Sequence, residues 1–401
     1  MKIFKSFKEG LSRNVIILGI VSGLTDISSE MLYPVIPIFL STVLNANMSI
    51  IGLIEGIAEA TANILKIWGG YISDKFRKRK FFVILGYSLS AISKPIMGFA
   101  HSWYFVLFAR FIDRVGKGIR TSPRDALIAA SSDKNHWGKA FGFHRAMDTL
   151  GAAIGPLITL FLFLFLGETE KTYRMIFIIA FIPAIFGVYI LRKYVKDESE
   201  ILDEKKHEIN STIQKDKLST DFKIFTFIFV LFSLIKFSDA FLIMKTKELG
   251  LSTTTIIMVY FTYNIVYAFI STPIGILSDR IGKSKVFMLS FLIYSIVCLG
   301  FAYSKNIYQI WILFVIYSLY GALSEGIAKA LVSTLTTQTN RATGMGIFQG
   351  LGGISVFFSS LIAGVLWDNF SSQTPFLVSA IISFVSLLLF LVWIKIRKIN
   401  L

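Results

Sequence analysis

The fold can be inferred from GYISDKFRKRK, residues 70–80, and from its second copy, GILSDRIGKSK, residues 275–285. Each copy ends a long apolar stretch with Gly-x-x-Ser-Asp and then places a cluster of basic residues before the next apolar stretch. Asp74 and Asp279 are 205 residues apart, which is about half of the 401-residue chain. The repeat therefore indicates an internal duplication in which each half crosses a membrane several times.

The composition is that of a membrane protein. Hydrophobic residues make up 54% of the chain and charged residues 16%, whereas about a quarter of the residues in a soluble domain are charged. The net charge is +16, but the basic residues crowd into alternate loops, a pattern that anchors cytoplasmic loops rather than binding nucleic acid. The single cysteine, Cys298, excludes an internal disulfide, and the scattered histidines predict neither a metal site nor a cofactor.

Twelve apolar helices are expected, because the apolar stretches reach the roughly 20 residues that span a bilayer. They lie near residues 15–44, 49–73, 81–100, 104–130, 138–166, 173–194, 222–246, 253–277, 286–304, 307–333, 343–368 and 375–396. The predicted fold is an all-α membrane protein of two pseudo-symmetric six-helix bundles, residues 1–194 and 222–401, joined by a cytoplasmic linker, residues 195–221. The basic loops predict a multi-pass protein of the bacterial inner membrane with both termini in the cytoplasm.

Ionisable residues interrupt the spans of the first half, where each must face a partner or water because burial in lipid is costly. One face of the predicted helix 104–130 carries them at three- and four-residue steps: Arg110, Asp113, Arg114, Lys117, Arg120 and Arg124. Further ionisable residues lie in the predicted helices 1, 2 and 5: Asp26, Glu30, Glu55, Glu59, His144, Arg145 and Asp148. Two interpretations stay open, a structural lattice of ion pairs and a site for substrate and proton coupling.

The repeated loop resembles the signature loop of the major facilitator superfamily, Gly-x-x-x-Asp-Arg-x-Gly-Arg-Arg/Lys. The second copy fits, and the first has Arg77 in place of the second glycine. Residues 109–118, ARFIDRVGKG, resemble the family's Arg-Phe-x-Gln-Gly-x-Gly-x-Gly element, whose arginine is linked to proton coupling; Arg110 occupies that position. Asp113 and Arg114 stand where glutamine and glycine are usual.

Part of the predicted fifth helix resembles the antiporter motif of drug-efflux members, although its closing Gly-Gly is absent. The matching residues are Gly142, Gly151, Gly155 and Pro156. Glycines at this spacing let two helix backbones approach closely. Residues 120–128 and 142–151 are also similar to a prokaryotic branch of the family and, more distantly, to carriers of carboxylate siderophores. The resemblance implies a secondary transporter whose two halves alternate around a midplane cavity.

The predicted function is proton-coupled export of a small organic anion such as a carboxylate or siderophore-like compound. The expected proton-coupling residues are Asp26, Glu30, Glu55, Glu59, Arg110, Asp113 and Asp148. The expected substrate-binding residues are Arg114, Lys117, Arg120, His144, Arg145, Tyr260, Tyr263, Asn264, Tyr267, Glu325 and Gln349. A conformational latch is expected from Gly70, Asp74, Lys75, Asp279 and Arg280, since an aspartate at a helix end can pair with arginine or cap a neighbouring helix.

Other functions remain possible from the sequence. A proton symporter could import a sugar, peptide or metal chelate, and only the helix 5 motif favours export over import. A lipid flippase or a non-transporting membrane sensor belongs to a different class, and the apolar second half would suit a flippase. No nucleophile with a paired base lies in the spans, so an enzyme is not predicted. The expected partners are a small-molecule substrate, protons and the lipid bilayer, and the protein is expected to be a monomer.

Overall fold

The computed structural model describes residues 11–76, 78–132, 136–197, 218–337 and 341–397, and its elements in these residues are all α-helices without any strand. In the first half they are α2 (Arg13–Leu32), α3 (Val35–Thr42), α4 (Met48–Phe76), α5 (Arg79–Gly98), α6 (Trp103–Ala130), α7 (Trp137–Leu166) and α8 (Glu170–Tyr194). In the second half they are α10 (Thr220–Ser233), α11 (Ala240–Glu248), α12 (Thr253–Ile281), α13 (Lys283–Tyr303), α14 (Ile307–Leu335), α15 (Arg341–Asn369) and α16 (Thr374–Arg397).

Ten helical stretches in the described residues are long and apolar enough to cross a membrane. Two of the predicted spans are absent from this set for physical reasons. α6 carries a row of charged residues, and the seventh predicted span is divided into the shorter helices α10 and α11. With these two, the helices account for the twelve predicted spans. The prediction of an all-α, multi-pass membrane protein is confirmed.

Two predicted helices are broken in the structure. The helix expected over residues 15–44 is divided into α2 and α3 at Tyr33 and Pro34, because proline lacks a backbone donor and disfavours helical geometry in the residue before it. The helix expected over residues 222–246 is interrupted at residues 234–239, a stretch without proline or glycine. The cause of this interruption is therefore packing against other helices and not the local sequence.

The chain divides into two compact units, one of Met1–Phe39 with Thr61–Asn210 and the other of Leu40–Ala60 with Ser211–Leu401. The first part of α4 therefore belongs to the second unit and its remainder to the first. Most of the predicted linker, residues 198–217, lies outside the described residues.

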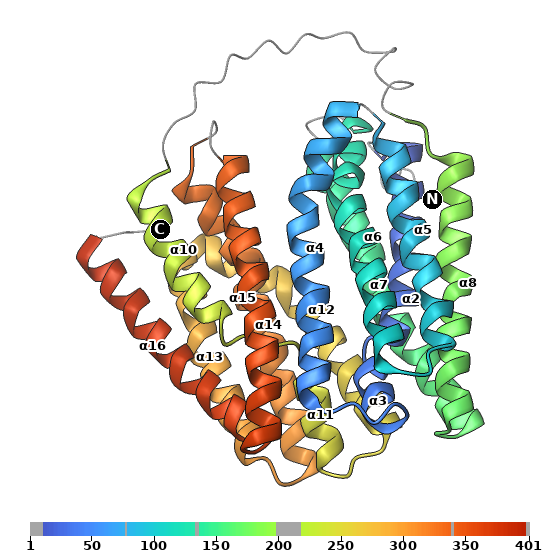
Figure 1. The fold of residues 1–401 in the computed structure, drawn as a ribbon. Helices are drawn as coiled ribbons and strands as arrows, with labels where there is room; N and C mark the ends of the chain where they lie inside the picture. Colours follow the sequence, from blue (N-terminus) through green and yellow to red (C-terminus); the bar gives the residue numbers. More distant parts are fainter. Residues whose placement is uncertain (1–10, 77, 133–135, 198–217, 338–340, 398–401) are drawn as a thin grey trace, which may run out of the picture. The chain divides into compact units, whose positions relative to one another are not determined.

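Glycines bring the helices of the first unit close together. α2 packs on α7 and α8, and α5 packs on α6 and α8, as Figure 1 shows. A Cβ on Gly86 of α5 would lie 2.5 Å from the carbonyl oxygen of Gly116 on α6. A Cβ on Gly118 would lie 2.5 Å from Cβ of Leu65 on α4. The backbones of these helices are therefore nearly in contact, as is common in membrane bundles.

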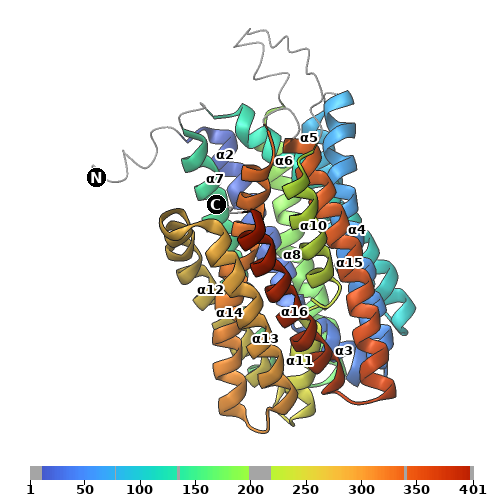
Figure 2. The same cartoon turned by 90° about the vertical axis from the view of Figure 1, so that its left-hand side faces the viewer.

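The second unit is packed around aromatic rings. In Figure 2, α13 lies beside α14 and α16, and α14 lies beside α12. Phe225 of α10 is fully buried; its ring centroid lies 5.7 Å from that of Phe348 on α15, 5.6 Å from Phe287 on α13 and 6.1 Å from Trp393 on α16. Rings at these separations attract one another beyond the burial of their area.

The N-terminus of α4 is capped from within the second unit. Asp368, near the end of α15, accepts hydrogen bonds from the backbone nitrogens of Met48 at 3.1 Å and Ser49 at 2.7 Å. A carboxylate at this position satisfies donors that the helix itself leaves free and interacts favourably with the helix dipole.

Candidate functional site

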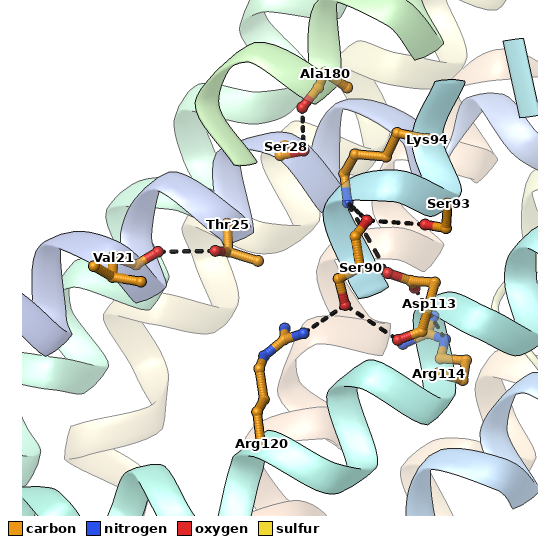
Figure 3. Close-up of polar contacts among 10 residues, drawn as sticks. All are labelled: Val21, Thr25, Ser28, Ser90, Ser93, Lys94, Asp113, Arg114, Arg120 and Ala180. Carbon is orange, nitrogen blue, oxygen red and sulfur yellow. Dashed lines mark hydrogen bonds and ion pairs between the residues drawn. The ribbon is translucent and has the colours of Figure 1, made fainter. Parts of the chain in front are cut away.

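The first unit contains a buried cluster of charged side chains on α5 and α6, drawn in part in Figure 3. Its members and exposed fractions are Lys94 (2%), Arg110 (4%), Asp113 (9%), Arg114 (6%) and Arg120 (5%). Nζ of Lys94 lies 4.0 Å from Oδ1 of Asp113, and Nε of Arg114 lies 3.8 Å from Oδ2. Among the charged side chains that are buried in the described part of this unit, four are cations and one is an anion. The cluster therefore holds an excess of positive charge away from bulk water, where charges interact most strongly.

Ser90 joins the two helices of this cluster. Its hydroxyl accepts a hydrogen bond from Nη1 of Arg120 at 2.6 Å and donates one to the backbone carbonyl of Asp113 at 3.1 Å. The carbonyl of Ser90 accepts a hydrogen bond from Nζ of Lys94 at 3.0 Å. The guanidinium of Arg120 also lies over the ring of Tyr87, 4.4 Å from its centroid, where the ring quadrupole attracts a cation. Arg120 is thus held in one place by α5.

A second group of ionisable residues comes from α2 and α7. Asp26 of α2 interacts electrostatically with Asp148 of α7 and with Glu30 one turn along its own helix. It also interacts with Lys117 and Arg120 of α6. The three carboxylates are half-buried, whereas Lys117 is exposed. Carboxylates that can take up a proton therefore lie within electrostatic range of cations that can neutralise them.

His144 and Arg145 on α7 have different surroundings. His144 is buried, and its Nδ1 lies 3.4 Å from Oδ2 of Asp148. Arg145 is exposed. Arg124, the last cation of the charged row on α6, is paired with its neighbour Asp125 at 2.8 Å.

The glycines of the helix 5 motif also differ. A Cβ on Gly151 would lie 2.5 Å from the carbonyl oxygen of Gly23, and a Cβ on Gly155 would lie 2.6 Å from that of Ile27. Both contacts are with the backbone of α2. At Gly142 no described atom lies within 4 Å of a Cβ position. Close approach of α7 to α2 is therefore confined to the part of the motif that ends at the buried Pro156.

The expected residues of the second half lie on α12, α14 and α15. Tyr260, Tyr263 and Tyr267 follow one face of α12, with ring centroids 5.8 Å and 6.3 Å apart in turn. The hydroxyl of Tyr267 donates to Oε2 of Glu325, an exposed residue of α14, at 3.0 Å. Asn264 and, on α15, Gln349 are half-buried.

Glu55 and Glu59 lie in the part of α4 that belongs to the second unit. Glu55 is 2% exposed, and its Oε2 accepts a hydrogen bond from the hydroxyl of Ser238 at 3.4 Å. Glu59 is half-buried and interacts electrostatically with Asp239. The acidic residues expected to act in proton coupling are therefore distributed over both units.

The latch residues are only partly described. Gly70 packs against Ser122 of α6, whose Cβ would lie 3.2 Å from a Cβ on the glycine. Arg280 is exposed near the end of α12. The side chains of Asp74, Lys75 and Asp279 lie outside the described residues, so the latch stays a prediction.

Two groups in the structure are missing from the set of expected site residues. Lys94 is a single lysine inside an apolar span, so the sequence itself marks it as a candidate. Its partners on α6 can be identified only from the packing of the helices. The second is Asp239, whose Oδ1 accepts the hydroxyl of Tyr317 at 2.5 Å. Tyr317 is one of many aromatic residues in its helix and carries no local signal.

Several known proteins resemble this chain, some over nearly its whole length and others over part of it. The profile of the Major Facilitator Superfamily matches residues 18–244 and 224–400. An uncharacterised MFS-type transporter of Methanocaldococcus jannaschii is 38% identical over 389 residues, which cover 95% of each chain. The probable 4-methylmuconolactone transporter of Cupriavidus pinatubonensis is 30% identical over 157 residues, which cover 38% of this chain and 35% of that protein. The crystal structure of the nucleoside transporter NupG has a TM-score of 0.77 at 15% identity and covers 95% of this chain and 99% of that chain.

Membrane-spanning helices in two units, with ionisable side chains inside the spans, are the architecture of a secondary transporter. The chain belongs to the major facilitator superfamily, as its match to the family profile and to the archaeal relative shows.

Proposed function

We propose that this transporter moves small organic anions of the carboxylate class and exports them in exchange for protons. The observation that carries the proposal is the excess of cations among the buried charges of the first unit, with Asp113 as their buried carboxylate. Burying a charge costs several kcal/mol unless other groups compensate for it. An anionic substrate would balance this excess of buried positive charge.

The carboxylates of α2 and α7 give the proposal its proton site. Asp26 and Asp148 interact with each other, and Asp26 also interacts with Lys117 and Arg120. When one carboxylate takes up a proton, its attraction for these cations falls, and a cation becomes available to the substrate. When the proton leaves, the cation returns to the carboxylate. The binding of the proton and the binding of the anion would thus be coupled through the cations that both groups share.

One further feature supports export, and one relative supports the substrate class. α7 touches the backbone of α2 at Gly151 and Gly155, within the motif that resembles that of antiporters. The compound in the name of the Cupriavidus relative carries a carboxylate. In this proposal the protein works as a monomer in the bacterial inner membrane with both termini in the cytoplasm. Gly70, Asp74, Lys75, Asp279 and Arg280 would latch its cytoplasmic ends.

The test uses the full-length protein in proteoliposomes that contain a pH-sensitive dye, with the membrane potential clamped by potassium and valinomycin. The probes are 4-methylmuconolactone, citrate and benzoate as anions, with uridine, xylose and tetraphenylphosphonium as neutral and cationic controls. An anion added outside should make the lumen more alkaline if the protein exchanges it for protons. A symporter would make the lumen more acidic.

Arg114→Gln is the informative variant, because it removes one buried cation beside Asp113. Arg192→Gln is its matched control, since Arg192 is exposed on α8 of the same unit. We expect Arg114→Gln to abolish the anion-evoked pH change and Arg192→Gln to preserve it. Equal transport by both variants would show that the buried cations are structural. A response to xylose or uridine alone would refute the anionic substrate, and acidification by anions would refute exchange.

A further inference from the structure

The break between α10 and α11, residues 234–239, is held open by three other helices of the second unit. The carbonyl of Ile235 accepts hydrogen bonds from the hydroxyl of Tyr294 on α13 at 3.3 Å and from that of Ser379 on α16 at 2.8 Å. The backbone nitrogen of Ser238 donates to the hydroxyl of Ser360 on α15 at 3.1 Å. Two backbone groups that an unbroken helix would satisfy, the carbonyl of Ile235 and the N–H of Ser238, are thus partnered by side chains, and these contacts stabilise the break.

Two charged residues, Lys236 and Asp239, lie in this break. The carboxylate of Asp239 accepts the hydroxyl of Tyr317 at 2.5 Å. Nζ of the half-buried Lys236 lies 5.6 Å from the centroid of the Tyr320 ring, and among the described residues no carboxylate oxygen is within the 4.0 Å of an ion pair. Asp239 and Glu325 act on Lys236 only over a longer range. An ammonium group in this position can bind an anion without first losing a direct ion-pair partner.

A panel of four tyrosines begins beside Lys236; we call Tyr320, Tyr317, Tyr263 and Tyr267 the tyrosine panel. The ring centroids of Tyr320 and Tyr317, both on α14, lie 5.4 Å apart with an interplanar angle of 25°. The ring of Tyr317 and that of Tyr263 on α12 have the same distance and angle. Tyr263 and Tyr267 lie 6.3 Å apart at 22°. Tyr317 and Tyr320 are buried, whereas Tyr263 and Tyr267 are half-buried. Near-parallel rings therefore lead from the ammonium to a partly open end.

The use of tyrosine here differs from the rest of the same unit. The core of the unit is built from phenylalanines such as Phe225 and Phe287, which pack without a hydroxyl group to satisfy. Asn264, on α12 between the last two tyrosines of the panel, has a buried Nδ2 without an acceptor among the described residues. A buried donor without a partner costs free energy, so such a group is typical of a site that a ligand completes.

We propose that this part of the second unit binds carboxylates that bear an aromatic ring, which narrows the substrate class of the proposed function on which it rests. The carboxylate binds Nζ of Lys236, the ring lies against the tyrosine panel, and Asn264 donates to a polar substituent. The ammonium supplies most of the affinity as a charged hydrogen bond. The rings select against aliphatic acids, since stacking rewards a flat ligand.

The test measures binding by titration calorimetry on the full-length protein in lipid nanodiscs. The probes are benzoate, which has a ring and a charge, hexanoate, which has only the charge, and benzamide, which has only the ring. The variants are Lys236→Gln, Lys236→Arg and Tyr263→Leu. Lys329→Gln is the matched control, because Lys329 is an exposed lysine on α14 of the same unit.

Wild-type protein should bind benzoate more tightly than either other probe. Lys236→Gln should weaken benzoate about 10- to 100-fold, the scale of a hydrogen bond to a charged group, and Lys236→Arg should retain most of the affinity. Tyr263→Leu should weaken benzoate about 3- to 10-fold and leave hexanoate unchanged. Lys329→Gln should bind like the wild type.

Equal benzoate affinity in Lys236→Gln and Lys329→Gln would overturn the site. Equal affinity of the wild type for benzoate and hexanoate would overturn the aromatic preference. If Arg114→Gln abolishes benzoate binding while Lys236→Gln does not, the proposed function stands and this inference fails. If no carboxylate binds the wild type, both fail together.

Discussion

Replacing Gly151 by alanine should force α7 away from α2. The added methyl group would lie 2.5 Å from the carbonyl oxygen of Gly23, 2.8 Å from Cβ of Asp26 and 3.0 Å from the backbone nitrogen of Ile27. Ordinary contacts of this kind are at 3.4–4 Å. Two of the three atoms belong to the backbone, so a change of side-chain rotamer cannot relieve the overlap, and the helices must separate by about 1 Å.

The expected cost follows from two opposing terms. Overpacking of a tight interface costs about 1–3 kcal/mol, and the rigid neighbours at Gly151 place this site at the upper end. Alanine in a helix interior returns about 1 kcal/mol relative to glycine. Gly151→Ala should therefore lose about 2 kcal/mol of stability. Gly142→Ala in the same helix meets no described atom within 4 Å and should gain up to about 1 kcal/mol.

Thermal unfolding of the purified full-length protein, followed by tryptophan fluorescence, compares the two variants with the wild type. For a unit of about 200 residues, 1 kcal/mol shifts the midpoint by about 2–4 °C, so the two variants should differ by about 6 °C or more. Equal midpoints for Gly151→Ala and Gly142→Ala would refute the reasoning, because the contact of α7 with α2 would then be looser than the structure shows.

Three other predictions test separate parts of the structure. Asp113→Asn should lower stability by about 3–5 kcal/mol, because it removes the carboxylate from a cluster of buried cations; adding Lys94→Gln should restore part of the loss in chemical unfolding. Asp368→Ala should cost about 1 kcal/mol as a lost helix cap, with faster amide exchange at Ser49 as the readout. Cys298, 1% exposed, should react with a maleimide only after denaturation, and rapid labelling of the folded protein would contradict its burial.

The two broken helices show what the sequence can and cannot predict. Pro34 marks the break between α2 and α3, but proline is an incomplete signal, because Pro123 and Pro156 lie inside the unbroken helices α6 and α7. Nothing in residues 234–239 marks the second break, which depends on hydroxyl groups from α13, α15 and α16. Those hydroxyl groups lie far away in the sequence. A local sequence pattern indicates only the helical propensity of its own residues, and at residues 234–239 packing against other helices outweighs that propensity.

The charged cluster divides in the same way. The spacing of Arg110, Arg114 and Arg120 predicts that they share a face of one helix, and all three are buried. Their partners cannot be predicted by spacing, because Lys94 and Ser90 come from another helix and reach α6 only through the approach of two glycines. Sequence periodicity predicts which face of a helix a residue lies on, whereas the residues that contact this face are determined only by the packed unit.

Many hydroxyl groups in this protein hold a neighbouring helix by its main chain. Ser28 donates to the carbonyl of Ala180, Thr159 to that of Met31, and Ser383 to that of Phe291. Since every residue type carries a backbone carbonyl, such a hydrogen bond requires a hydroxyl group at the donor position but no particular side chain at the acceptor position. In a deep mutational scan the donor positions should therefore require a hydroxyl group, whereas the acceptor positions, which are fully buried, should respond to the packing of their side chains alone.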